Sequence, residues 1–262
     1  MGCCGSKSAN SSANRIARWK STGIVALRDG KLKALPDEVL EVDGFVRTVD
    51  LTNNKIVELP PDINKLINMQ RLVLANNVLK SLPTCVGCLQ SLKTLTLDGN
   101  RITILPDELG SLSRLERFSI SGNLLTCLPD TIGNLRGHMS TTCGITGVER
   151  TCTRDESTWR GAQESVSADN SIEKLPETVC NLINLKSLLL NNNHVNQLPK
   201  NLLKNCRALQ TLSLHNNPIT MEQFQQMEGF GEFEERRKKK FEKQINSNVL
   251  MDSKGLDQGL DL

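Results

Sequence analysis

The residues of this sequence that could take part in chemistry lie mostly at its start. Met1, Gly2 and Ser6 fit the M-G-x-x-x-[ST] pattern, in which the methionine is removed and the glycine amine is myristoylated. Cys3 and Cys4 follow directly and offer thiols for palmitoylation. One acyl chain binds a bilayer marginally, whereas a second contributes about 0.8 kcal/mol per buried methylene. We therefore expect lipidation at Gly2, with Cys3 and Cys4 as palmitoyl sites.

Residues 1–22 surround this motif with groups that favour a membrane surface. Basic side chains add about 1 kcal/mol each near an anionic leaflet, and this segment carries Lys7, Arg15, Arg18 and Lys20. Two apolar side chains, Ile16 and Trp19, could enter the interface between water and lipid. The rest of the segment is rich in Ser and Asn, so we expect a lipidated, disordered arm. The alternative is a disordered tail whose cysteines are incidental.

Other reactive side chains form no recognisable site. Cys85 and Cys88 make a CxxC pair, but zinc needs four ligands and no second pair stands at a suitable spacing. The histidines, at positions 138, 194 and 215, fit neither a metal cluster nor a Ser/His/Asp order. No glycine-rich loop precedes a Lys-Ser/Thr pair. We therefore expect no catalytic residues, no metal and no cofactor, and a protein that is not an enzyme.

The elements that must position any site are built from one repeating unit. Residues 91–112 read SLKTLTLDGNRITILPDELGSL, with aliphatic residues spaced around Asn100 and with Pro106 following Leu105. Asparagines recur in this register every 23 residues, at Asn54, Asn77, Asn100 and Asn123, and prolines recur at Pro60, Pro83, Pro106 and Pro129. This is the leucine-rich-repeat pattern, in which Leu95 and Leu97 form a short strand that faces inward.

Stacked copies of this unit predict an α/β leucine-rich-repeat solenoid, or horseshoe, over residues 23–222. It contains about seven to eight repeats of 23 residues, including degenerate copies. The first copy has Gly30 in place of asparagine and reads as a cap; later copies carry Asn170, Asn193 and Asn217. Because proline ends a regular helix, the convex segments should be short helices, 3₁₀ turns or extended chain. An aromatic content of 3% agrees with an aliphatic core.

One repeat is interrupted. Asn123 and Asn170 are 47 residues apart, which is two periods plus one, and residues 136–169 contain no leucine. We interpret this segment as a non-repeat, disordered replacement for one repeat, produced by out-of-frame or intronic coding; the alternative is a genuine functional loop. Sequencing the transcript across this segment decides between them. We also expect the interruption to uncouple the block ending near Leu135 from the block beginning near Ile172.

Strand residues that point away from the core line the concave face, the usual binding surface of a horseshoe. Small polar residues dominate this face, with arginines and aspartates among them. This mixture predicts a protein ligand of mixed charge, although each residue could instead be a solvated strand position. The candidate partner-binding residues are Asp50, Arg71, Asp98, Arg117, Leu189 and His215.

Residues 223–262 predict a capping helix, broken near Gly229 and Gly231, followed by a disordered tail. The basic run 236–240 has glutamates four residues before three of its members, which favours pairing along the helix. A functional basic patch is the alternative. A net charge of +3 is too small to predict nucleic-acid binding. No apolar run of membrane-spanning length and no signal-peptide core occur in the sequence.

Three segments carry a resemblance to a known family: MGCCGSK at the start, TGIVALRDGKLKALP at 22–36 and MEGFGEFEERRKKKFEKQI at 227–245. With the repeats between them, the chain resembles the intracellular leucine-rich-repeat proteins of the Ras-suppressor type. Within that type it resembles the small, lipid-anchored members of the plant intracellular Ras-group-related group. Residues 136–169 depart from the family pattern.

The resemblance implies a membrane-anchored protein-interaction scaffold in intracellular signalling, with a small GTPase or a receptor-associated protein as the candidate partner. Its expected place is the cytoplasmic face of the plasma membrane, with a cytosolic pool. The alternative is a regulatory or substrate-recruiting subunit of an enzyme such as a phosphatase or ubiquitin ligase. Neither reading includes a nucleic acid or a small-molecule substrate.

Overall fold

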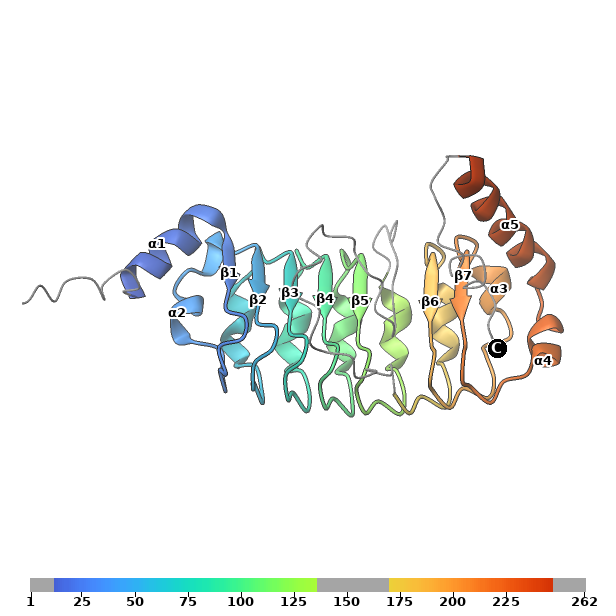
Figure 1. Cartoon of the computed structure of the whole chain (residues 1–262), viewed down its shortest axis with the longest axis horizontal. Coiled ribbons are helices and arrows are strands. Elements are labelled where there is room, and N and C mark those ends of the chain that lie inside the picture. The colour runs from blue at the N-terminus through green and yellow to red at the C-terminus, as the bar shows by residue number, and fades with distance from the viewer. Residues whose placement is uncertain (1–11, 136–169, 247–262) are drawn as a thin grey trace, which may run out of the picture.

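The repeats fold into an elongated stack of layers, most of which contribute one short parallel strand (Figure 1). The computed structural model describes residues 12–135 and 170–246. Core residues of successive strands lie in one register, from Val49 through Leu72 and Leu95 to Phe118. This is the predicted α/β leucine-rich-repeat solenoid. Its strands are β1 (Ile24–Ala26), β2 (Thr48–Asp50), β3 (Arg71–Val73), β4 (Thr94–Thr96), β5 (Arg117–Ser119), β6 (Ser187–Leu189) and β7 (Thr211–Ser213).

The opposite side of most layers is a single short turn of helix, which begins after a proline. In the five 3₁₀ turns described between residues 61 and 181, the preceding proline has extended backbone, and the leucine after the turn donates its N–H three residues back, as Leu112 does to Leu109. These segments are α2 (Asp37–Leu40), η1 (Asp43–Phe45), η2 (Pro61–Lys65), η3 (Thr84–Cys88), η4 (Asp107–Ser111), η5 (Asp130–Asn134), η6 (Glu177–Asn181) and α3 (Leu202–Asn205).

Buried asparagines tie each layer to the one before it. The Nδ2 of Asn100 donates to Leu97 O in its own layer at 2.8 Å and to Leu74 O in the preceding layer at 2.9 Å. Its Oδ1 accepts the N–H of Leu79 at 3.0 Å. One side chain therefore satisfies backbone groups that burial would otherwise leave without partners. Corresponding bonds to the preceding layer are made by Asn54, Asn77, Asn123, Asn170 and Asn217.

This asparagine ladder continues across the interruption. Asn170 donates to Ile120 O at 2.9 Å and accepts the N–H of Leu125 at 3.0 Å, as Asn123 does with the layer before it. Ser171 N–H donates to Leu125 O at 2.7 Å. The hydrophobic core is likewise one cluster that runs from Trp19 to Phe233.

The layers of Asn123 and Asn170 are therefore direct neighbours, and the expected uncoupling is wrong. The prediction of a missing repeat assumes that the 23-residue spacing continues between Asn123 and Asn170. Since the two layers are neighbours, the 47-residue spacing is instead one period plus 24 additional residues. The predicted disorder of residues 136–169, and the loss of a strand within them, lie outside the described residues.

A helix closes the N-terminal end of the stack. Helix α1 (Ser12–Thr22) packs Trp19, which is 5% exposed, and Ile16 against the core. Arg15 fixes the helix to α2 through a two-pronged bond to Glu38, at 2.9 and 2.6 Å. The prediction of a disordered arm is wrong for residues 12–22, and Ile16 and Trp19 do not face a membrane, because they cover the apolar edge of the first layer. Gly2, Cys3 and Cys4 lie outside the described residues.

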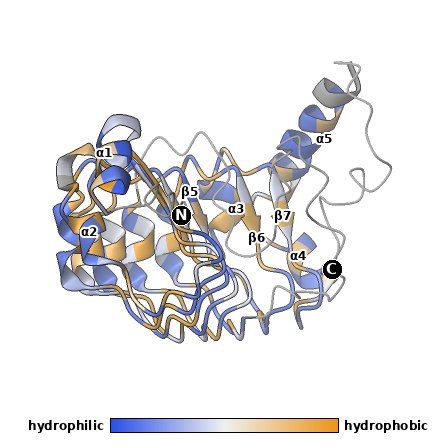
Figure 2. Cartoon of the chain, turned by 60° about the vertical axis from the view of Figure 1, so that its left-hand side comes forward, coloured by the Kyte–Doolittle hydropathy of each residue, from blue (hydrophilic) through white to orange (hydrophobic). Residues whose placement is uncertain are grey.

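Two helices close the C-terminal end. Helix α4 (Met221–Gln225) starts at a capping box formed by Thr220 and Gln223. The chain breaks at Gly229, whose φ is 87°, before α5 (Phe230–Asn246), which is mostly hydrophilic and projects beyond the stack (Figure 2). Edge-to-face contacts join Phe224 to Phe230 and Phe233, and both Phe224 and Phe233 are fully buried. Residues 247–262, predicted to form a disordered tail, lie outside the described residues.

The basic run on α5 is partly used to hold this cap in place. Arg236 donates to Leu203 O at 3.0 Å and to Leu209 O at 3.1 Å, so its guanidinium binds carbonyls of the last repeats. Lys240 donates to the hydroxyl of Thr211 at 2.7 Å. For Arg236 and Lys240, neither of the two expected roles, pairing along a solvated helix or forming an exposed basic patch, applies, because both side chains bind the stack.

Candidate protein-interaction surface

The exposed face of the sheet, predicted above as the concave face, presents three columns of side chains. Strand register aligns the first two columns, and the residue two positions later supplies the third. The first column is Thr48, Arg71, Thr94, Arg117, Ser187 and Thr211. The second is Asp50, Val73, Thr96, Ser119, Leu189 and Ser213, and the third is Thr52, Ala75, Asp98, Ser121, Asn191 and His215.

Asp50 is not available to a ligand, because it is buried in an ion pair within the protein. Its Oδ2 accepts Nε of Arg28 at 2.8 Å, and its Oδ1 accepts the N–H and hydroxyl of Thr52 at 3.1 and 2.7 Å. Burial by itself raises the pKa of Asp50, but the bonds from Arg28 and Thr52 outweigh burial and hold this pKa below its ordinary value. The carboxylate stays ionised and paired.

Asp98 joins two layers in the same way. It accepts the hydroxyl of Ser119 at 2.7 and 2.9 Å and the N–H of Ser121 at 2.7 Å, both from the next repeat. Burial raises the pKa of Asp98, and these bonds oppose that shift in part. Asn191 makes the equivalent bonds, to the hydroxyl of Ser213 at 2.6 Å and the N–H of His215 at 2.9 Å. Asp98 and Asn191, both in the third column, therefore hold neighbouring layers together.

Arg71 and Arg117 remain exposed on this face. They occupy the first column two layers apart, with Thr94 between them, which places their Cα atoms about 10 Å apart at the usual strand spacing. Asp50 is neutralised by Arg28, and Asp98 is hydrogen-bonded within the protein, so Arg71 and Arg117 face solvent without an internal ion pair to either carboxylate.

The six predicted binding residues do not form one group. Asp50, Arg71, Asp98 and Arg117 belong to the sheet of β1 to β5, whereas the half-buried Leu189 and His215 belong to the sheet of β6 and β7. Sequence reasoning missed the pairing partner of Asp50. Arg28 follows β1 at the third-column position of the first repeat, so the register could have identified it.

Comparison with known proteins decides the family. The leucine-rich-repeat family model matches residues 46–102. A rice protein (Oryza sativa subsp. japonica), "Plant intracellular Ras-group-related LRR protein 7", is 54% identical over 262 residues, covering all of both chains. This chain belongs to the plant intracellular Ras-group-related LRR proteins. Membership implies a function through protein–protein interaction.

Solved structures show the same fold in larger proteins. The LRR ectodomain of the Arabidopsis thaliana membrane receptor kinase GASSHO1/SCHENGEN3, in complex with CASPARIAN STRIP INTEGRITY FACTOR 2, is 25% identical with a TM-score of 0.54. The match covers 73% of this Ras-group-related LRR chain and 21% of the receptor chain. The peptide hormone receptor RGFR1, in complex with RGF2, is 22% identical with a TM-score of 0.53, over 71% and 27% of the two chains. This chain thus spans about a quarter of each receptor chain.

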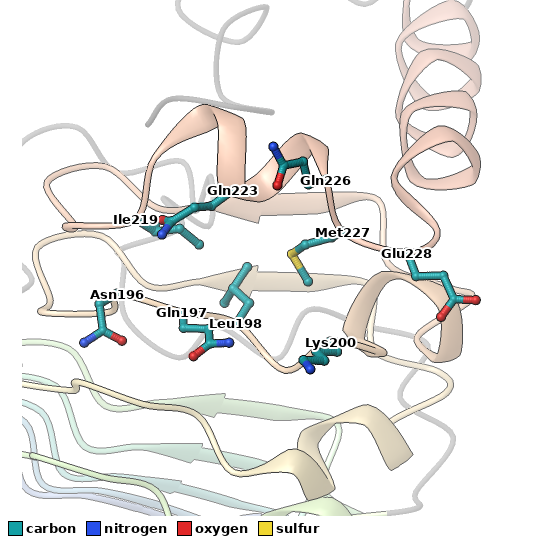
Figure 3. A pocket seen from close by; sticks show the side chains of 9 residues that line it. All are labelled: Asn196, Gln197, Leu198, Lys200, Ile219, Gln223, Gln226, Met227 and Glu228. Atoms are coloured by element: carbon teal, nitrogen blue, oxygen red, sulfur yellow. The ribbon is translucent and has the colours of Figure 1, made fainter.

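A second concave feature lies at the C-terminal end of this Ras-group-related LRR chain. A cavity of about 720 Å³ opens between the last repeat and α4 (Figure 3). Amide side chains predominate in its wall, together with one ion-paired carboxylate, since Glu228 lies 2.6 Å from Lys204 Nζ. The lining residues are Asn196, Gln197, Leu198, Lys200, Ile219, Gln223, Gln226, Met227 and Glu228. These groups suit hydrogen bonding and offer no thiol or imidazole.

The cysteines at positions 85, 88, 127, 180 and 206 take part in no disulfide. Cys85 donates to Pro61 O at 3.0 Å, and burial raises the pKa of its thiol. Burial also raises the pKa of Cys206 to about 12. Across residues 12–135 and 170–246, no three His, Cys, Asp or Glu side chains gather to hold a metal ion, and no helix is long and apolar enough to cross a bilayer.

Proposed function

We propose that this Ras-group-related LRR protein is a lipid-anchored scaffold that binds an acidic segment of a protein partner on its exposed sheet face. The observation that carries the binding proposal is the pair Arg71 and Arg117, two exposed cations in one column whose neighbouring carboxylates are engaged elsewhere. Guanidinium groups bind carboxylates in a two-pronged geometry. An acidic side chain from a partner can therefore bridge the two layers without competing with an internal ion pair.

Replacing both Arg71 and Arg117 with Glu is expected to weaken partner binding about 100-fold, because two attractive charge pairs become repulsive at the interface. Proximity labelling identifies the neighbours of the intact protein in cells, and titration of a purified neighbour measures the affinity. The matched control replaces Arg101 and Arg114 with Glu, since these arginines are also exposed but lie outside the three columns. Equal losses from the two variants, or none from the first, would contradict the proposal.

The class of partner separates two forms of this function. A small GTPase or a receptor-associated protein among the dominant neighbours supports a signalling scaffold. One catalytic partner at equal stoichiometry, such as a phosphatase or ubiquitin ligase, supports a regulatory or substrate-recruiting subunit. The charge-reversal pair applies to both, because the same sheet face would hold either partner.

Gly2→Ala is expected to release the protein from the membrane fraction, because only an N-terminal glycine is myristoylated. In this proposal the anchored protein sits on the cytoplasmic face of the plasma membrane, with a cytosolic pool. Cys3→Ser with Cys4→Ser, keeping Gly2, is expected to leave weak and reversible binding, since one acyl chain is marginal. Fractionation of cell lysates measures both results. If the Gly2→Ala protein pellets with membranes as fully as the parent, the anchor is elsewhere.

A further inference from the structure

We propose that the N-terminal end of the solenoid carries a second membrane contact, made by the folded protein itself with anionic lipid headgroups. The contact consists of Arg18, Lys20, Ile24, Phe45 and Arg47, which we call the N-terminal patch. The inference deepens the proposed lipid anchor and rests on it for its setting in the cell. It assigns this end of the stack, where α1 and β1 lie in Figure 1, as the end that faces the bilayer.

Two large apolar side chains of the patch face solvent. Phe45 is 57% exposed and Ile24 is 50% exposed, although the residues next to them in the chain, Val46 and Val25, are fully buried in the core. The sequence had offered Ile16 and Trp19 for this role, but those two side chains are turned inward. Exposed aromatic and aliphatic groups at one end of a folded domain suit the boundary between headgroups and acyl chains.

Basic side chains surround these apolar groups. Lys20 Nζ lies 5.9 Å from the centroid of the Phe45 ring. Gly23 lies close to both Phe45 and Arg47. Its carbonyl accepts the N–H of Arg47 at 2.8 Å. A Cβ placed on Gly23 would lie 3.0 Å from Phe45 O and 3.6 Å from Arg47 Cγ. Ile24 follows directly in β1. Lys20, Ile24, Phe45 and Arg47 are therefore contiguous, and Arg18 lies on the same helix as Lys20.

The charge of the helix that carries Arg18 and Lys20 favours an anionic surface. Helix α1 has the sequence SANRIARWKST, which contains no acidic residue, and Glu38 on the neighbouring α2 is already paired with Arg15. Arg18, Lys20 and Arg47 are all exposed. Long basic side chains can reach headgroup phosphates while their alkyl stems lie along apolar surface. This combination of cations and an aromatic ring at the acylated end of the chain favours a lipid surface over a protein partner.

The position of the patch in the chain supports the same occupant. Ser12, the first residue of α1, is eight positions after Cys4, so at most about 28 Å of chain lies between the acylation motif and the helix. An anchored chain therefore holds the patch at high local concentration near the bilayer, where a weak contact is sufficient to orient the protein.

The test uses the full-length protein expressed without acylation, so that the folded surface is unchanged and no acyl chain contributes to binding. Sedimentation measures binding to vesicles of phosphatidylcholine with phosphatidylserine and to vesicles of phosphatidylcholine alone. We expect binding only to the anionic vesicles. Lys20→Ala with Arg47→Ala should weaken it about 25-fold, at about fivefold for each cation, and Phe45→Ala should weaken it about fivefold.

The matched control is Lys238→Ala with Lys239→Ala, which removes two exposed cations from α5 at the other end of the stack. This variant should bind as the parent does. Phe45→Trp supplies a second readout, since its emission should shift to the blue when anionic vesicles are added. Circular dichroism verifies that each variant is folded.

Three results would overturn the proposal: equal binding to neutral and anionic vesicles, equal losses from the patch and control variants, or no emission shift from Phe45→Trp. Loss of a partner protein from the Phe45→Ala variant in cells, with vesicle binding intact, would assign the patch to a protein instead. Failure of the lipid anchor appears separately, in the fractionation of Gly2→Ala, because the vesicle assay contains no acyl chain.

Discussion

Gly133→Ala is expected to destabilise the protein by about 3 kcal/mol, because the added methyl group has no room between two layers. A Cβ on Gly133 would overlap the carbonyl oxygen of Thr178 and would lie 2.7 Å from both the carbonyl carbon and the Cβ of that residue. The obstruction is backbone from the next layer, so no side-chain rotation relieves it. Gly110 meets Thr131 in the same way one layer earlier.

Gly231→Ala is the control for this substitution. Gly231 lies in α5 with no atom within 4 Å of an added Cβ, so the change should leave stability equal or raise it by up to about 1 kcal/mol through helix propensity. Urea denaturation followed by circular dichroism gives both values. If Gly133→Ala proves as stable as the parent, η5 and η6 do not pack as described and the interruption separates them after all.

Asn170→Ala is expected to cost about 3 kcal/mol and to turn one unfolding transition into two. The side chain bonds both Ile120 O and Leu125 N–H, so its removal leaves two buried backbone groups without their partner. These two bonds are among those that join the layers on either side of the interruption. Weakening them should let the part of the stack after Asn170 unfold at a lower urea concentration.

The control removes a different asparagine bond. Asn76 donates to Asn53 on the surface at 2.8 Å and has a φ of 54°, a conformation that glycine adopts at the equivalent Gly99. Asn76→Gly therefore keeps the backbone and loses one exposed hydrogen bond, at a cost of at most about 1 kcal/mol. A single transition in Asn170→Ala, with a midpoint equal to that of Asn76→Gly, would show that the buried ladder does not couple the layers.

Much of the stack could be predicted from spacing alone. Asparagine and proline positions predicted the layers, the strand register and the short convex turns, because each layer repeats the same local contacts. The path of the chain around the interruption could not be predicted in this way. Stacking is decided by which asparagine reaches which carbonyl, and Asn170 reaches Ile120, which is 50 residues earlier.

The candidate sites were harder to predict because their surroundings come from distant residues. Trp19 and Ile16 lie on one side of a basic helix, a pattern that serves a membrane or the open end of a solenoid equally well. The structure shows the second case, because both side chains pack against the core at the end of the stack. Asp50 and Asp98 looked like ligand-binding groups for a similar reason: their partners Arg28 and Ser119 are 22 and 21 residues away.

The asparagine ladder continues directly from Asn123 to Asn170, so it does not depend on the length of the coding segment between Leu135 and Asn170. The core is specified by the order of the asparagines, and the number of codons between Leu135 and Asn170 does not enter that order. Messages that lengthen this stretch in frame would leave unchanged the residues that make the bonds of Asn170 to Ile120 and Leu125. Alternative splicing could therefore alter what the protein displays at this point while leaving its architecture unchanged.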